Sequence, residues 1–166
     1  MPPRIIVLVG LPGSGKSTYV KTHGLPALSS DAVRLLLADK ETDQTIHGRV
    51  FATLRYLLCQ RIAIGRPVTY VDATHLTPSE RKPYLVIGQR LGCQVEALFF
   101  DVPLEVCKQR NRLRPRIVPG EAIDSMAARM VRPSRAEGFS HVWVISSRAA
   151  SPASPIAPPG PGPEAR

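Results

Sequence analysis

The sequence contains few cysteines and no long apolar runs. No apolar run approaches the roughly 20 residues that cross a bilayer, so we expect no membrane-spanning helix and no membrane partner. The chain has three cysteines, Cys59, Cys93 and Cys107, and no two of them have the spacing of metal ligands. An odd number without such spacing favours reduced thiols in the core and a cytoplasmic location. Met-Pro-Pro-Arg leads directly into an apolar strand, so we also expect no signal peptide.

Acidic and aromatic residues are also scarce. The 13 acidic residues face 22 basic ones, which gives a formal net charge of +9. Either a polyanionic partner or a coding bias towards arginine explains this excess. The segment 110–116 favours the first, because it gathers Arg110, Arg112, Arg114 and Arg116. Four Phe, four Tyr and one Trp are too few for an extended stacking platform for single-stranded nucleic acid.

Residues 5–18 form an apolar strand followed by a glycine-rich loop, IIVLVGLPGSGKST. Gly10, Gly15, Lys16 and Ser17 satisfy the phosphate-binding pattern G-x-x-x-x-G-K-[ST], and a helix-compatible stretch follows it. A strand–helix turn that binds nothing is the alternative, but a buried strand before the glycines argues against a chance match. The sequence therefore predicts a nucleoside triphosphate site.

The chemistry of the loop assigns an expected role to each side chain. Gly13 and Gly15 let successive backbone N–H groups point at one anion. Lys16 is expected to reach the β- and γ-phosphates, and the Ser17 hydroxyl to ligate Mg²⁺. The expected nucleotide-binding residues of the loop are Gly10, Gly13, Ser14, Gly15, Lys16, Ser17 and Thr18. ATP and Mg²⁺ are the expected cofactors.

Strand and helix patterns alternate along the chain, which is typical of an α/β fold with a doubly wound parallel sheet. We expect five strands, at 4–9, 27–29, 68–71, 95–100 and 142–145. We expect helices to begin at Gly15, at Asp31, near Thr45, at Pro78, at Pro103 and near Gly120. Residues 147–166 hold six of the 17 prolines and are expected to be a disordered tail after a single domain over 1–146.

Two carboxylates follow predicted strands at the sheet edge where the phosphate-binding loop lies. Asp31 is the candidate base, and Arg34 shares its helix face and is able to grip an anionic acceptor. The alternative is that Asp31 only caps its helix. Asp72 ends a strand and is expected to support Mg²⁺ or a catalytic arginine, with a merely polar strand end as the alternative. His75 has no partner at ligand spacing, so we interpret it as a surface or hydrogen-bonded histidine.

The segment 109–116, QRNRLRPR, joins two predicted helices. Arginines in such a position are typical of a kinase lid, which closes over the triphosphate and stabilises charge during transfer. A solvated basic turn is the alternative.

Taken together, these motifs resemble the polynucleotide 5′-hydroxyl kinase family of P-loop kinases, which includes the phage enzyme and the kinase module of bacterial end-healing proteins. The matching segments lie at residues 10–18, 31–34, 72–81, 100–103, 110–114 and 118–119. The resemblance implies a P-loop kinase domain with strand order 2-3-1-4-5. It also implies transfer of the γ-phosphate of ATP to a 5′-hydroxyl end of DNA or RNA, and so a nucleic acid partner.

The resemblance implies roles for individual residues as well. Asp31 corresponds to the general base and Arg34 to the residue that holds the neighbouring phosphate of the strand. Lys16 and Arg114 correspond to the residues that stabilise the transferred phosphate, with Asp72 in support. Arg110 and Val118 lie where the family makes its adenine and lid contacts.

The chain departs from that family in two respects. It has neither the length nor an Asp-x-Asp motif for the phosphatase domain of the phage member, and Ser30 stands where that enzyme has an arginine. The same motifs resemble a broad group of uncharacterised bacterial kinases. A kinase of a small hydroxylated or phosphorylated metabolite and a non-catalytic ATP-binding module therefore remain alternatives.

Overall fold

The computed structural model describes residues 1–146, so the predicted tail at 147–166 lies outside the described residues. The strands are β1 (Arg4–Val9), β2 (Ala27–Ser29), β3 (Val68–Asp72), β4 (Gln94–Asp101) and β5 (His141–Ser146). The helices are α1 (Lys16–Thr22), α2 (Ser30–Ala38), α3 (His47–Ala63), α4 (Pro78–Leu91), α5 (Leu104–Arg112) and α6 (Gly120–Arg129), followed by a short 3₁₀ turn at Arg135–Glu137.

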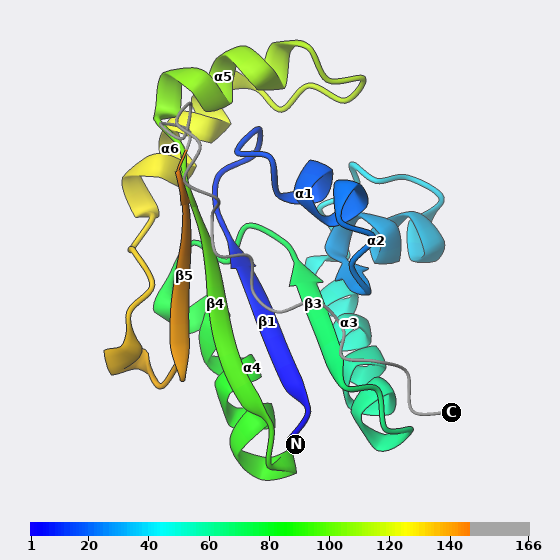
Figure 1. Ribbon diagram of the computed structural model, residues 1–166. Helices are drawn as coiled ribbons and strands as arrows, with labels where there is room; N and C mark the ends of the chain where they lie inside the picture. The colour runs from blue at the N-terminus through cyan, green and yellow to red at the C-terminus, as the bar shows by residue number, and fades with distance from the viewer. Residues whose placement is uncertain (147–166) are drawn as a thin grey trace.

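The five strands form one parallel sheet in the order β2-β3-β1-β4-β5, which confirms the predicted fold (Figure 1). Alternate residues of β1 face opposite layers, as the period of a strand requires. Ile5, Val7 and Val9 pack with residues of α2, α3 and α4, whereas Ile6 and Leu8 pack with residues of α1. Both faces of β1 are therefore buried, which explains its unbroken apolar sequence.

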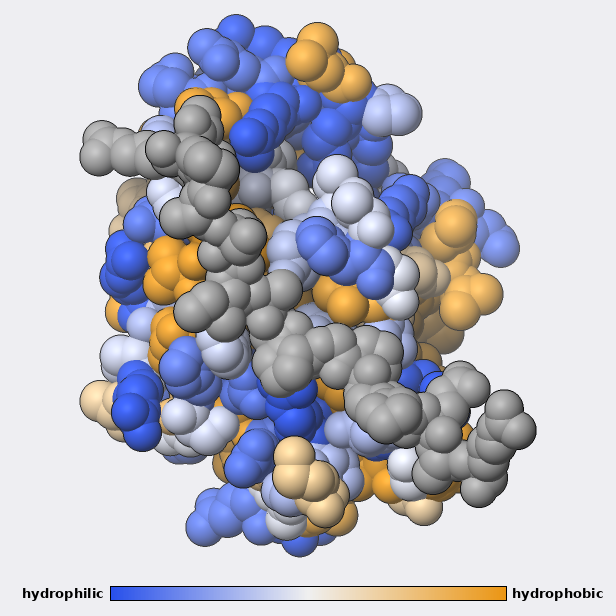
Figure 2. All heavy atoms as spheres, viewed as in Figure 1, coloured by the Kyte–Doolittle hydropathy of each residue, from blue (hydrophilic) through white to orange (hydrophobic). Residues whose placement is uncertain are grey.

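Helix α5 and the segment that follows it lie beyond the carboxyl ends of β1 and β4 (Figure 1). Mostly hydrophilic side chains gather at this end of the molecule (Figure 2). The site must therefore be sought between this segment and the sheet edge. Within residues 1–146, no helix has the length and apolar character needed to cross a membrane.

Helix starts agree with the predictions to within two residues, and α4 begins at Pro78 with the predicted capping box between Thr77 and Glu80. The start of α2 differs in an informative way. Ser29 is its N-cap and accepts a hydrogen bond from the backbone N–H of Ala32 at 3.3 Å. Asp31 lies in the first turn instead, so its carboxylate is not used to cap the helix.

Two buried polar side chains fix the loop between β3 and α4. His75 lies in the left-handed region at φ 48°, and its Nδ1 is 2.7 Å from the carbonyl oxygen of Leu8. Its Nε2 is 3.1 Å from the Tyr84 hydroxyl, so it is the hydrogen-bonded histidine that the sequence indicated. Burial lowers the pKa of His75 to about 4, which keeps the ring neutral at pH 7. Arg81 is fully buried and donates to the carbonyl oxygen of His75 at 2.8 Å.

Candidate functional site

The glycine-rich loop joins β1 to α1 and has the backbone geometry that an anion-binding loop needs. Gly13 and Gly15 have φ angles of 82° and 97°, in the left-handed region that favours glycine. A Cβ on Gly13 would also collide with the backbone carbonyl of Cys107 in α5, and one on Gly10 would come within 2.7 Å of Ser14 Oγ. Gly10 and Ser14 thus form the base of the loop, and Ser14 Oγ is buried without a hydrogen-bond partner in the described structure.

The Lys16 side chain is buried inside this loop. Its ammonium donates to the carbonyl oxygens of Gly10 and Leu11, at 2.9 Å each. Burial lowers the pKa of Lys16 to about 8; the positive charge of Arg114 adds to this shift, and the negative charge of Asp72 opposes it. The loop therefore contains a cation that is poorly solvated and would gain from a nearby phosphate.

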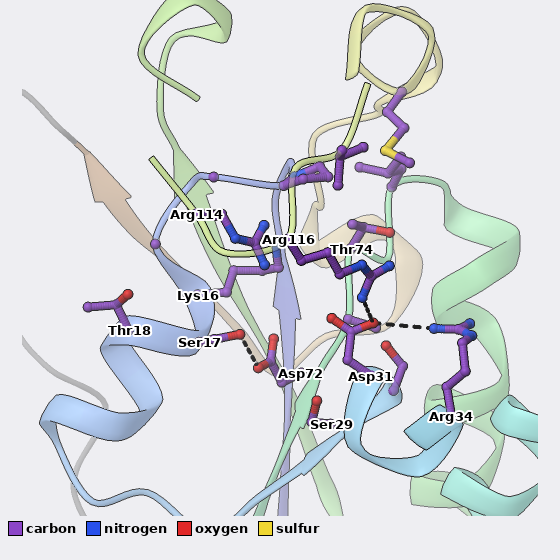
Figure 3. A pocket seen from close by; sticks show the side chains of 18 of the residues that line it. Lys16, Ser17, Thr18, Ser29, Asp31, Arg34, Asp72, Thr74, Arg114 and Arg116 are labelled. Atoms are coloured by element: carbon purple, nitrogen blue, oxygen red, sulfur yellow. Dashed lines mark hydrogen bonds and ion pairs between the residues drawn. The ribbon is translucent and has the colours of Figure 1, made fainter. Parts of the chain in front are cut away.

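Ser17 and Asp72 meet across the start of α1 and the end of β3. The Ser17 hydroxyl donates to Asp72 Oδ2 at 2.8 Å (Figure 3). Both side chains offer hard oxygen ligands of the kind that Mg²⁺ prefers. Residues 1–146 contain no group of three His, Cys, Asp or Glu side chains that could hold a metal. A metal ion at this pair would need its remaining ligands from elsewhere, for example from phosphate oxygens and water.

Asp31 carries two arginine contacts on one carboxylate oxygen. Arg34 Nη1 lies 3.3 Å from Asp31 Oδ1, and Arg116 Nη1 lies 3.1 Å from the same atom (Figure 3). Arg34 is only 4% exposed, and its Nε has no hydrogen-bond partner in the described structure. The Asp31 side chain is 44% exposed and remains accessible from the cavity that these residues line.

One cavity of about 660 Å³ contains nearly all the predicted site residues. It is lined by the predicted residues Gly13, Gly15, Lys16, Ser17, Thr18, Asp31, Arg34, Asp72, Arg110, Arg114 and Val118. Six cationic side chains and three carboxylates line it in all, so the cavity suits an anionic ligand. The structure therefore brings the predicted donor and acceptor residues together, with Gly10 and Ser14 at the base of the loop.

The segment between α5 and α6 covers this cavity as the predicted lid would. Arg110 Nη1 lies 3.7 Å from where a Cβ on Gly15 would stand, so it contacts the loop directly. Asn111 fixes the return of the segment, because its amide nitrogen donates to the Val118 carbonyl at 2.6 Å and its oxygen accepts from the Val118 N–H at 3.0 Å. Arg114 and Arg116 project from this segment into the cavity (Figure 3).

The sequence did not identify two residues that shape the site. Arg116 was noted only as a member of the arginine cluster, and its contacts with Asp31 and, at 3.8 Å, with Glu41 depend on tertiary structure. The sequence gives a faint signal for Asn111, because it is an amide among arginines. The structure shows that its side chain is almost fully buried.

Solved structures with the same fold include an RNA repair complex and a gluconokinase. The structure of a Pnkp1/Rnl/Hen1 RNA repair complex matches with a TM-score of 0.65 and 17% identity, over 76% of this chain and 43% of that one. A gluconokinase from Sinorhizobium meliloti matches with a TM-score of 0.57 and 20% identity, over 90% of this chain and 85% of that one. At these identities, the likeness shows the P-loop kinase type of fold and not the substrate.

Sequence comparison gives a partial relative and a family. The L-seryl-tRNA(Sec) kinase of Homo sapiens is 31% identical over 96 residues, which cover 57% of this chain and 27% of that kinase. The AAA_33 family model, described as an AAA domain, matches residues 5–133. Because this match spans well over half of a chain that also carries the phosphate-binding loop and its sheet, the protein belongs to the AAA_33 family.

Proposed function

We propose that this protein is an ATP-dependent kinase that transfers the γ-phosphate to a 5′-hydroxyl end of DNA or RNA. The observation that carries the proposal is the position of Asp31. Its accessible carboxylate shares a cavity with the phosphate-binding loop and has the buried cation Arg34 at its side. This combination suits a hydroxyl that lies beside a phosphate of a nucleic acid strand, because a base can accept its proton while a cation holds the neighbouring phosphate.

The donor half of the cavity binds the triphosphate. The loop N–H groups and Lys16 hold the β- and γ-phosphates, and Arg114 lies close enough to Lys16 to influence its pKa. Arg110 and Val118 contact the nucleotide from the lid. Ser17 and Asp72 would hold Mg²⁺, which would supply positive charge to offset the negative charge on the phosphates.

The acceptor half of the cavity orients the hydroxyl. The hydroxyl oxygen attacks the γ-phosphorus, and a new P–O bond forms as the bond to the oxygen bridging the β- and γ-phosphates breaks. Asp31 takes the proton of the hydroxyl, and ADP leaves. Arg34 holds the phosphate next to the reacting nucleoside, where a ligand oxygen would also satisfy its unpaired Nε.

The names of two similar proteins support an RNA-linked acceptor. One is a kinase of L-seryl-tRNA(Sec) and the other belongs to an RNA repair complex. The net positive charge of the chain and the cationic lining of the cavity suit the same class of acceptor.

Asp31→Asn tests the proposal in an assay of labelled phosphate transfer from ATP to 5′-hydroxyl oligonucleotides of DNA and RNA. We expect the rate to fall roughly 10²- to 10⁴-fold because the base is lost, while the affinity for ATP changes little. Asp39→Asn is the matched control, because Asp39 is an exposed acid at the other end of α2. An unchanged rate in Asp31→Asn would remove Asp31 as the base.

A small hydroxylated metabolite is the second candidate acceptor. It is favoured by the scarcity of aromatic side chains in the cavity lining, where Phe51 and His47 supply the only rings within residues 1–146. The likeness to a gluconokinase over 90% of this chain also supports this candidate. ATP consumption with sugars but no label on any oligonucleotide would favour this candidate and overturn the nucleic acid acceptor.

A further inference from the structure

We propose that Arg116 of the lid is a second ligand of the acceptor phosphate already assigned to Arg34, and that Arg116 masks the Asp31 carboxylate until this phosphate binds. This inference rests on the proposed kinase function and extends it. It makes a phosphate on the acceptor a condition for efficient transfer, and it makes the lid sensitive to the acceptor as well as to ATP.

The contacts of Arg116 cross the cavity. The side chain projects from the segment between α5 and α6, and its Nη1 lies 3.1 Å from Asp31 Oδ1 on α2 (Figure 3). The same nitrogen lies 3.8 Å from Glu41 Oε2. Asp31 is the proposed base, so the lid contacts the acceptor half of the site directly. An arginine that served only the triphosphate would have no need to reach across to α2.

Two guanidinium groups on one carboxylate oxygen leave several donors without a partner there. Each guanidinium has five N–H donors, and a single oxygen atom satisfies few of them. The buried Nε of Arg34 is one such donor, because it has no hydrogen-bond partner in the described structure. A tetrahedral phosphate offers oxygens to both guanidinium groups at once and forms bidentate contacts that are stronger than those to a single carboxylate oxygen.

The resulting exchange also affects the base. When the acceptor phosphate takes over Arg116, the ion pair between Arg116 and Asp31 breaks and the carboxylate loses a competitor for its lone pairs. Asp31 then becomes available to accept the proton of the hydroxyl. An acceptor without the phosphate leaves Arg116 on Asp31, so it binds weakly and meets a masked base.

Arg116→Ala tests this inference with a matched pair of acceptors, cytidine 3′-monophosphate and cytidine, at saturating ATP. We expect the KM for cytidine 3′-monophosphate to rise about 10- to 100-fold, since charge-assisted hydrogen bonds are lost. The KM for ATP should change less than about threefold. Cytidine should bind weakly to both proteins, but its kcat should be higher in Arg116→Ala, because Asp31 is no longer masked. Arg112→Ala is the control, because it removes an exposed cation of α5 that does not line the cavity.

Calorimetric binding of cytidine 3′-monophosphate to the protein loaded with a non-hydrolysable ATP analogue separates the two proposals. Weaker binding in Arg116→Ala without phosphorylation of any oligonucleotide by wild type would retain the phosphate site and overturn the nucleic acid kinase. Equal use of both acceptors by wild type, or a loss confined to the KM for ATP, would overturn the role of Arg116 and leave the kinase intact.

Discussion

Lys16 is a buried cation whose partners in the structure are backbone carbonyls. Its pKa in the folded protein, about 8, lies below the value of 10.5 for a free lysine. Between these two values the unfolded chain binds more protons, so stability without nucleotide rises with pH over this window. A bound triphosphate would reverse the shift, because its negative charge favours the ammonium form.

Nucleotide binding should therefore take up protons in a pH-dependent way. At pH 8.5 roughly a quarter of Lys16 is charged in the free protein, so ATP binding should take up about 0.7 proton, against about 0.1 at pH 7. Calorimetry in buffers of different ionisation enthalpy measures this number. Lys16→Arg keeps a permanent charge and should show no such uptake, whereas equal uptake at both pH values in wild type would contradict the assignment to Lys16.

The residues of the site were predictable where local sequence determines their position. Asp31 and Arg34 lie three apart on one helix, and they form the ion pair that this spacing favours. Arg114 and Arg116 are separated by one proline in a loop without periodicity, so nothing in the sequence indicates which of them reaches α2. The path of the lid segment is set by the contacts of the Asn111 side chain with Val118, which only the folded chain reveals.

At the scale of secondary-structure elements, the phosphate-binding loop and α5 approach backbone to backbone. A Cβ on Gly13 would collide with the carbonyl oxygen, the carbonyl carbon and the Cα of Cys107. These are backbone atoms of α5, so they cannot rotate away. The glycine-rich loop and the helix that leads into the segment 113–119 are therefore packed as one unit at this point.

Gly13→Ala should reveal the strength of this contact. The change introduces strain at a positive φ and a collision with α5, and we expect it to lower stability by about 2–4 kcal/mol and to weaken ATP binding. Gly65→Ala is matched to it, because Gly65 has nearly the same φ, 81°, with open space around it. Urea unfolding measures the loss of stability in each variant, and the difference between the two losses is the cost of the collision with α5. Equal losses would show that the contact with α5 adds nothing.

Strands and helices were predicted better than the contacts between them. β1 and β2 have the predicted bounds, and β3, β4 and β5 extend one residue or less beyond theirs at either end. Apolar runs and capping residues carry that information locally. The start of α2 was placed one residue late, because Ser29, Ser30 and Asp31 are all good capping residues and only the fold selects among them.

At the scale of the whole molecule, Arg81 joins segments that lie far apart in the chain. It belongs to α4 and pairs with Glu137, with Nε–Oε1 and Nη2–Oε2 distances of 2.9 Å each. It also donates to the carbonyl oxygens of His75 and Val131, at 2.8 and 3.1 Å. The loop beside the site and the segment that leads into β5 are thereby held by one side chain.

Arg81→Met should be strongly destabilising, by about 3–5 kcal/mol, because Glu137 and two carbonyls lose their buried partner. Arg132→Ala removes an exposed ion pair with Asp101 and a contact over the Phe99 ring, so it should cost no more than about 1 kcal/mol. Denaturant midpoints compare the two variants. If Arg81→Met cannot be purified in a folded form, Glu137→Gln is a milder test of the Arg81–Glu137 pair. A loss of stability no larger than that of Arg132→Ala would show that this pair does not stabilise the fold.

The parallel register of β1 has a consequence for how the chain acquires its binding loop. β1 pairs with residues 68–71 of β3 on one side and with residues 94–99 of β4 on the other. Both partner strands are therefore synthesised well after β1. Such distant pairings fold slowly, since long loops must close before any strand contact forms. During synthesis, the glycine-rich loop after β1 therefore leaves the ribosome before either strand that pairs with β1, and the sheet edge around the loop is complete only when β3 and β4 have followed.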